Sequence, residues 1–282
     1  MQFRFRWRAF TARAMLRALL RRLSLAVPMI LAVLASLLLA TRAISRAFVF
    51  PVRRVATMAT PADFTVHALV ARDGVPVRAL ELPGPAGSRV LVDFHNNRET
   101  AESRVGLARE LRSRGLGVLL VEYRGYGGSG GEPTEEGLYL DAEAALDMLS
   151  RRGVDADRIV LCGTSLGTGV AAEMARRGRG ARLVLVSPYT SLPDLVVDRV
   201  PFLPARALMP DHFDTLAKSS AIRVPTVIIH GDDDEIVPIG MGEQLARAIP
   251  AARLVRVSGG HHGDLFAREG DRLLAEIARL GS

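Results

Sequence analysis

The segment with the clearest capacity for chemistry is the G-x-S-x-G pattern at 163–167, which is centred on Ser165. The apolar run 158–162 leads into this pattern, and the helix-like segment 166–177 follows it. A sharp turn between a strand and a helix lifts a serine hydroxyl above the sheet edge, and only small flanking residues avoid a clash there. The start of the helix adds a partial positive charge beside the hydroxyl. We therefore predict that Ser165 is a nucleophile rather than part of an ordinary glycine-rich turn.

A serine becomes an effective nucleophile only when a base takes its proton and a third group orients that base. Three aspartates at 232–234 follow the apolar run 226–230, and two histidines, His261 and His262, follow the run 253–257. From the residues alone, any of the three aspartates could be the acid and either histidine the base. A metal site is not expected, because a third close ligand at zinc-like spacing is missing.

These segments resemble the triad segments of the alpha/beta-hydrolase superfamily. Residues 230–238, HGDDDEIVP, are similar to the family's H-G-x-x-D-x-x-V-P segment, whose aspartate holds the catalytic histidine. Residues 258–264, SGGHHGD, are similar to its G-x-G-H-N-D segment. The resemblance implies the chain order serine, acid, histidine, with Asp234 as the acid and His262 as the base. His261 remains the alternative base.

Hydrolysis at this serine also requires backbone N–H donors for the negative oxygen of the tetrahedral intermediate. The resemblance implies that one donor is Leu166, the residue after the nucleophile. The second donor belongs to the loop at 94–98, where many relatives carry H-G-N. Asn96 stands in place of that glycine, and asparagine tolerates a left-handed backbone. We therefore expect the N–H of Asn97 to complete the oxyanion hole.

Two further segments narrow the resemblance to one branch of the superfamily. Residues 122–133, EYRGYGGSGGEP, look like its Y-R-G-Y-G-x-S-x-G-x-P loop, and residues 187–192, SPYTSL, look like its S-P-[FY]-x-S-L segment. This branch contains N-terminally anchored serine hydrolases, including relatives that remove palmitoyl groups from proteins. The resemblance implies a small-molecule or lipid-like acyl ester or thioester as substrate. It leaves the acyl and leaving groups open, because one fold hosts many chemistries.

Apolar, β-branched runs alternate with helical patterns through the body of the chain. Strands are expected at 65–71, 75–82, 89–95, 117–122, 158–162, 182–187, 226–230 and 253–257, and helices at 99–113, 135–152, 166–177 and from about 270. This alternation predicts an α/β fold over 63–282, with a mainly parallel sheet and helices on both faces. Residues 188–222 interrupt the alternation as a short cap. The apolar side chains of the cap form either an acyl-binding pocket or a cover for the core.

The net charge of +7 is concentrated at one end of the chain. Residues 1–62 hold eleven arginines and no acidic residue, so the remainder carries about −4. No basic patch with interleaved aromatic residues appears in the folded part, and nucleic-acid binding is therefore not expected. Cys162 is the only cysteine, which excludes an intramolecular disulfide framework. No dinucleotide, flavin or metal motif is present, so no cofactor is expected.

Residues 23–41 form an uncharged stretch of 19 residues near the N-terminus. A helix of this length spans roughly 28 Å, close to the thickness of a bilayer's hydrocarbon core. The stretch predicts a transmembrane signal-anchor between a basic segment at 1–22 and a linker at 42–62. Seven arginines precede the stretch and four follow it, which favours a cytoplasmic N-terminus and a hydrolase domain outside the cytoplasm. A cleaved signal peptide is the alternative.

Two other functions compete with the ester or thioester hydrolase. A serine peptidase can use the same fold and triad, but such peptidases usually carry larger caps or extra domains than 282 residues allow. A catalytically silent membrane-bound scaffold would keep the fold without its chemistry. The complete set of serine, aspartate and histidine argues against a silent scaffold, whereas Asn96 in place of glycine favours it.

Overall fold

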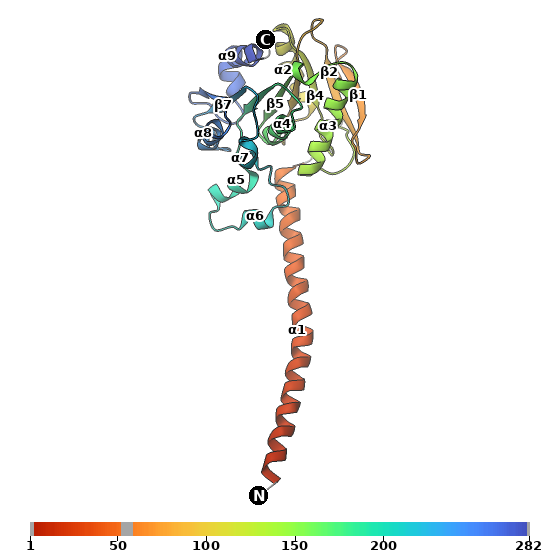
Figure 1. Cartoon of the computed structure of the whole chain (residues 1–282), viewed down its shortest axis with the longest axis vertical. Coiled ribbons are helices and arrows are strands. Elements are labelled where there is room, and N and C mark those ends of the chain that lie inside the picture. The colour runs from red at the N-terminus through yellow and green to blue at the C-terminus, as the bar shows by residue number, and fades with distance from the viewer. Residues whose placement is uncertain (1–2, 52–58, 281–282) are drawn as a thin grey trace. The chain divides into compact units, whose positions relative to one another are not determined.

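The structure is a computed structural model that describes residues 3–51 and 59–280. The chain divides into two units, Met1–Ser45 and Arg46–Ser282. Helix α1, Phe3–Val49, forms the described part of the first unit, and its last four residues belong to the second (Figure 1). All the residues predicted to carry chemistry lie in the second unit.

Helix α1 contains the stretch at 23–41 that was expected to be a transmembrane anchor. Its backbone is helical there, although several of its side chains lie outside the described set. Within the described part of the chain, no helix is long and apolar enough to cross a membrane. The prediction of a transmembrane signal-anchor is therefore unsupported, and the side of a membrane on which the hydrolase domain lies stays a prediction.

The segment expected to be a linker, 42–62, begins as a continuation of α1. Val49 and Phe50 are buried in the core of the second unit. Residues 52–58 of the expected linker lie outside the described residues. The folded unit therefore begins earlier in the chain than the boundary at 63 that the sequence suggested.

One eight-stranded sheet forms the centre of the second unit, in the order β1-β2-β4-β3-β5-β6-β7-β8. Its strands are β1 Thr65–Val70, β2 Pro76–Leu82, β3 Val90–Phe94, β4 Gly117–Val121, β5 Ile159–Thr164, β6 Arg182–Val186, β7 Thr226–Gly231 and β8 Ala252–Val257. Strand β2 pairs antiparallel with both β1 and β4, whereas all pairings from β4 to β8 are parallel. The predicted mainly parallel sheet is confirmed.

Helices cover both faces of this sheet (Figure 1). The helices of the unit are α2 Val105–Ser113, α3 Glu135–Arg151, α4 Leu166–Arg176, α5 Leu192–Arg199, α6 Ala205–Leu208, α7 Thr215–Ser219, α8 Ile239–Ala248 and α9 Leu265–Leu280, with short 3-10 turns η1 Ala101–Arg104 and η2 Ala156–Arg158. Apolar side chains of α3, α4 and α8 pack on one face, and those of α2 and α9 pack on the other. The sequence missed α8 and began α9 five residues too late.

Strand β3 illustrates how the sequence builds the two layers of core. Val90, Val92 and Phe94 join the hydrophobic cluster on one face of the sheet, and Leu91 joins the cluster on the other. Successive side chains of a strand point to opposite faces, and a sheet covered on both sides accepts apolar residues at every position. The continuous apolar runs in the sequence therefore correspond to strands that are buried on both faces.

Asp93 is the one charged residue of β3, and Arg104 at the end of η1 is its partner. The guanidinium donates to both carboxylate oxygens at 3.0 Å, and to the Thr164 hydroxyl of β5 at 3.1 Å. Both charged side chains are buried. A buried carboxylate requires a charged or hydrogen-bonding partner, so this pair fixes the position of η1 against the ends of β3 and β5.

Arg104→Ala should lower the free energy of unfolding by about 3–5 kcal/mol, because it leaves the Asp93 carboxylate buried without its cation. The matched control is Arg109→Ala, which breaks the bidentate pair with Asp63 at 2.8 Å on the exposed surface. The control should leave stability nearly unchanged, because solvent already screens that pair. Urea unfolding measures both variants. Equal losses in the two variants would contradict a special role for the buried pair.

Candidate active site

Ser165 lies in the tight turn between β5 and α4. Its φ of 51° is in the left-handed region, which a residue with a side chain rarely adopts. Its backbone N–H donates to the Val186 carbonyl at 2.9 Å, and its own carbonyl accepts from the Thr168 amide at 2.9 Å. These bonds hold the strained conformation, in which the Ser165 hydroxyl lies within hydrogen-bonding distance of His262.

The two glycines of the G-x-S-x-G pattern permit this turn by allowing close backbone contacts. A Cβ at Gly163 would lie 2.3 Å from the Gly167 carbonyl oxygen. A Cβ at Gly167 would lie 1.9 Å from the Phe94 carbonyl oxygen and 2.9 Å from that of His95. Only glycine fits such distances, so the start of α4 rests directly on the end of β3.

The structure brings Ser165, His262 and Asp234 together from three separate loops. His262 Nε2 lies 3.0 Å from the Ser165 Oγ, and His262 Nδ1 lies 2.9 Å and 3.0 Å from the two oxygens of Asp234. Because a carboxylate only accepts, the Nδ1 atom carries the proton and donates it to Asp234. The Nε2 atom is then free to accept the serine hydroxyl proton, which is the geometry of a general base.

The Asp234 carboxylate is fully buried in the loop after β7. It accepts the backbone N–H groups of Ile236 at 3.0 Å and Val237 at 2.8 Å. Burial alone would raise the pKa of Asp234, but hydrogen bonds from His230, His262 and the Val237 amide outweigh burial and hold the pKa well below its usual range. The carboxylate is therefore ionised at neutral pH and can stabilise a protonated His262.

The residues that the sequence left as alternative acids and as the alternative base lie outside this hydrogen-bonded chain. Asp232 and Asp233 are exposed, unlike Asp234. His261 is also exposed, and its Nδ1 lies 3.2 Å from a Glu235 carboxylate oxygen. The hydrogen-bonded chain to Ser165 therefore runs through His262 and Asp234.

The loop after β3 lies beside the start of α4, as the contact at Gly167 shows. Leu166 is the first residue of α4, and the first N–H groups of a helix have no partner within it. Asn96 does not adopt the left-handed backbone that was considered for it, since it is not among the non-glycine residues with positive φ. Its side-chain oxygen instead accepts the Arg98 N–H at 2.8 Å, a turn that asparagine stabilises.

The side chain and carbonyl of Asn97 are held from two directions. The side-chain amide donates to the Val49 carbonyl at 2.9 Å, and the Asn97 carbonyl accepts the Tyr126 hydroxyl at 3.2 Å. Sequence reasoning missed both partners, because Val49 lay in the expected linker and neither contact follows a local pattern. Asn97 is thereby fixed between the end of α1 and the loop after β4.

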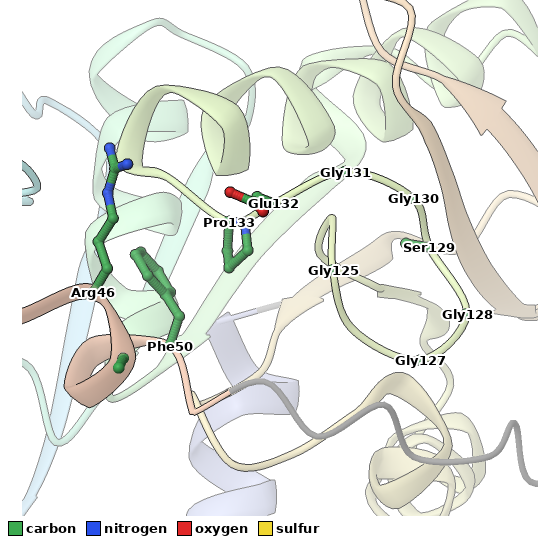
Figure 2. A pocket seen from close by; sticks show the side chains of 11 residues that line it. Arg46, Phe50, Gly125, Gly127, Gly128, Ser129, Gly130, Gly131, Glu132 and Pro133 are labelled. Atoms are coloured by element: carbon green, nitrogen blue, oxygen red, sulfur yellow. The ribbon is translucent and has the colours of Figure 1, made fainter. Parts of the chain in front are cut away.

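A pocket of about 720 Å³ opens beside this region. Figure 2 shows its two walls, the glycine-rich loop at 125–133 on one side and Arg46 with Phe50 on the other. The lining does not include Ser165 or His262, so the pocket is separate from the hydrogen-bonded triad. Across residues 3–51 and 59–280, no group of three histidine, cysteine or acidic side chains is arranged to hold a metal ion.

Comparisons with known proteins agree with this architecture. Residues 87–217 match the family described as serine aminopeptidase S33, and residues 205–268 match the alpha/beta hydrolase fold family. An uncharacterised protein of Mycobacterium tuberculosis is 40% identical over 199 residues, which cover 70% of each chain.

Solved structures share the fold at low sequence identity. An esterase of Pyrococcus furiosus superimposes with a TM-score of 0.68 at 18% identity, covering 81% of this chain and 97% of the esterase. Est1E of Butyrivibrio proteoclasticus, solved with ferulic acid bound, gives a TM-score of 0.63 at 17% identity and covers 76% and 97% of the two chains. The chain belongs to the alpha/beta-hydrolase superfamily.

Proposed function

We propose that this protein is a serine hydrolase that cleaves carboxylic esters or thioesters through an acyl-enzyme. The observation that carries the proposal is the chain of hydrogen bonds from Ser165 through His262 to Asp234, with no link longer than 3.0 Å. A buried, ionised aspartate behind the histidine and a strained serine in front of it are the features that nucleophilic catalysis requires.

In the proposed reaction, the Ser165 Oγ attacks the acyl carbonyl carbon while His262 Nε2 takes the hydroxyl proton. The Asp234 carboxylate stabilises the resulting imidazolium, and the N–H groups of Leu166 and Asn97 stabilise the oxyanion. His262 then protonates the leaving alcohol or thiol as the intermediate collapses to an acyl-enzyme. A water molecule, activated by the same histidine, hydrolyses the acyl-enzyme and restores the serine.

The cap supports an apolar acyl group as substrate, because its apolar side chains divide into two sets. Leu192, Met209 and Phe213 are buried in the core and cover it. The exposed set lies between α5 and α6 and includes Phe202, which is 98% exposed, together with Val200 and Leu203. The sequence left open whether the cap covers the core or forms an acyl-binding pocket; the buried set covers the core, and the acyl-binding role of the exposed set stays a proposal.

Arg199 connects the exposed part of the cap to the acid loop. Its guanidinium donates to the backbone carbonyl of Ile236 at 2.9 Å and also to that of Glu235. Ile236 is itself 43% exposed, two residues after Asp234. The part of the cap that carries the exposed apolar residues is therefore held against the loop of the triad acid, and contact of an acyl chain on Ser165 with these residues is part of the proposal.

A serine peptidase is the second candidate, and the match to the family described as serine aminopeptidase favours it. The short cap helices, of eight and four residues, favour esters instead, because peptidases of this fold usually carry larger caps. Turnover of amino-acid p-nitroanilides, compared with p-nitrophenyl esters, separates the two. The hydrogen-bonded triad argues against the silent scaffold.

A fluorophosphonate probe should label the wild-type protein and fail to label Ser165→Ala, because only an activated serine reacts with the phosphorus centre. His262→Ala should lower the rate of ester hydrolysis by at least about 10³-fold, because the general base is lost. Labelling is read by in-gel fluorescence, and turnover is read with p-nitrophenyl butyrate.

His261→Ala is the matched control, because it removes the adjacent and more exposed histidine. This control should retain labelling and turnover close to those of the wild type. If His261→Ala loses activity and His262→Ala keeps it, the assignment of the base is wrong. A folded wild-type protein that shows neither labelling nor turnover would reject the hydrolase itself.

Phe202→Asp should reduce kcat/KM for p-nitrophenyl decanoate about tenfold, because about 1.4 kcal/mol of apolar contact with the chain is lost. Turnover of p-nitrophenyl acetate should be nearly unchanged, since an acetyl group is too short for that contact. Val70→Asp, an exposed apolar-to-acid change on the edge strand β1, is the control for a general effect of added charge. Equal losses on both esters would exclude a role for the cap in chain recognition.

A further inference from the structure

A buried histidine lies directly after β3, in the loop expected to supply an oxyanion donor. The His95 side chain is 1% exposed, and its Nδ1 lies 2.7 Å from the Asn96 carbonyl oxygen. Its Nε2 lies 2.9 Å from a carboxylate oxygen of Glu122, the residue that follows β4 and whose side chain is fully buried. The hydrolytic mechanism described above uses neither side chain.

The partners of His95 define where its protons lie. A backbone carbonyl and an ionised carboxylate both accept, and a ring between two acceptors donates from both nitrogens when it is an imidazolium. Burial acts to lower the pKa of His95, but the hydrogen bond to Glu122 and the charge of its carboxylate outweigh burial and raise the pKa above its usual value. The surroundings of the ring therefore favour its protonated form over its neutral form.

The bond to Asn96 fixes the orientation of one peptide group. In a planar trans peptide, the C=O of one residue and the N–H of the next point in opposite directions. Because the Asn96 carbonyl points at the His95 ring, the Asn97 N–H must point away from that ring. This N–H is the one expected to donate to the oxyanion, so the ring sets which way the donor faces, together with the longer bond that the Glu99 N–H donates to the same carbonyl at 3.4 Å.

The same loop touches the start of α4. The carbonyl oxygens of Phe94 and His95 are the atoms that a Cβ at Gly167 would meet. The Tyr123 hydroxyl donates to the His95 carbonyl at 2.9 Å, and this bond holds the backbone of His95 in place. The loop is thus pinned next to Leu166, where the second N–H donor originates.

We propose that His95, held by Glu122, is a positioning residue that aims the Asn97 N–H into the oxyanion hole. This inference rests on the proposed hydrolase function and extends it to a pair of residues that does not touch substrate. A peptide flip between Asn96 and Asn97 would remove one donor, and the carbonyl would then face the developing negative charge.

Glu122 connects this pair to two further segments. Its second carboxylate oxygen accepts the backbone N–H of Ala101, the first residue of η1, at 3.0 Å. The carboxylate also lies under Gly127 of the glycine-rich loop, where a Cβ would come within 1.8 Å of it. Glu122 therefore holds the oxyanion loop, the helix that follows it and the glycine-rich loop in one arrangement.

The pair also predicts a pH dependence. The charged and titratable groups around the His95 ring are Glu122, Glu99, Tyr123 and Tyr126. Because the pKa of His95 is raised by folding, its positioning effect is complete below about pH 6.5 and is lost as the pH rises through the raised pKa. The proton facing Asn96 leaves first, since the carboxylate of Glu122 is the stronger acceptor.

Two substitutions at His95 separate the two hydrogen bonds. Gln places its amide nitrogen near the position of Nε2, so His95→Gln keeps the bond to Glu122 and loses the bond to the Asn96 carbonyl. Asn places its amide nitrogen near the position of Nδ1, so His95→Asn keeps the bond to Asn96 and leaves Glu122 without its cation. His95→Asn should therefore be the less stable variant and the more active one.

With p-nitrophenyl butyrate, His95→Gln should lower kcat about 10²-fold at little change in KM, because an oxyanion donor acts only in the transition state. His95→Asn should retain kcat within about tenfold of the wild type, although it unfolds at lower urea. The wild-type kcat should fall on the alkaline side, and His95→Asn should lack that fall because it carries no titrating ring.

If the less stable variant, His95→Asn, also has the lower kcat of the two, the positioning role is overturned and a structural role remains. So would an unchanged kcat in His95→Gln, or the same alkaline fall in His95→Asn as in the wild type. These outcomes require an active wild type and therefore leave the hydrolase function standing. A wild type without labelling or turnover rejects the function, and this inference with it.

Discussion

The contact of Gly167 with the carbonyl oxygens of Phe94 and His95 is the constraint on which the site depends. It sets the distance between β3 and the start of α4, and so between the oxyanion loop and the serine turn. A single methyl group at Gly167 would force these segments apart, and in a close-packed interior such a shift spreads to its neighbours. The strained φ of Ser165 persists because contacts on both sides leave the turn no room to relax.

Buried carboxylates fix the loops around this contact, each through a different cation or donor. Asp93 is held by Arg104, Glu122 by His95, and Asp234 by His262. Each acid lies in the last residues of a strand or in the loop that follows it, and parallel strands bring these loops to a common edge. A buried charge without a partner is costly, so each pair restricts its loop to the arrangement in which the partner is present.

The sequence predicted all eight strands because their apolar, β-branched runs are long enough to be distinctive. It missed α8, because glycine disfavours helices and the first turns of α8 contain Gly240 and Gly242. A Cβ at Gly242 would lie 2.4 Å from the ring of His230, so tertiary packing requires glycine there although its helix propensity is low. Short motifs were enough to predict the three residues that the structure brings together as Ser165, Asp234 and His262. The pair of His95 and Glu122 has no such signal, because its members are 27 residues apart and meet only once β3 and β4 lie side by side.

The pocket in Figure 2 has one wall that is rich in glycine. At Gly125, Gly127, Gly130 and Gly131 the direction in which a side chain would grow is already occupied, by Pro133, Glu122, Pro76 and Val75 respectively. A substitution at any of these four glycines would therefore disrupt packing before it could alter contacts with a ligand. On the opposite wall Phe50 is buried in the core, whereas the Arg46 side chain is 46% exposed, so the character of the pocket is most readily varied at Arg46.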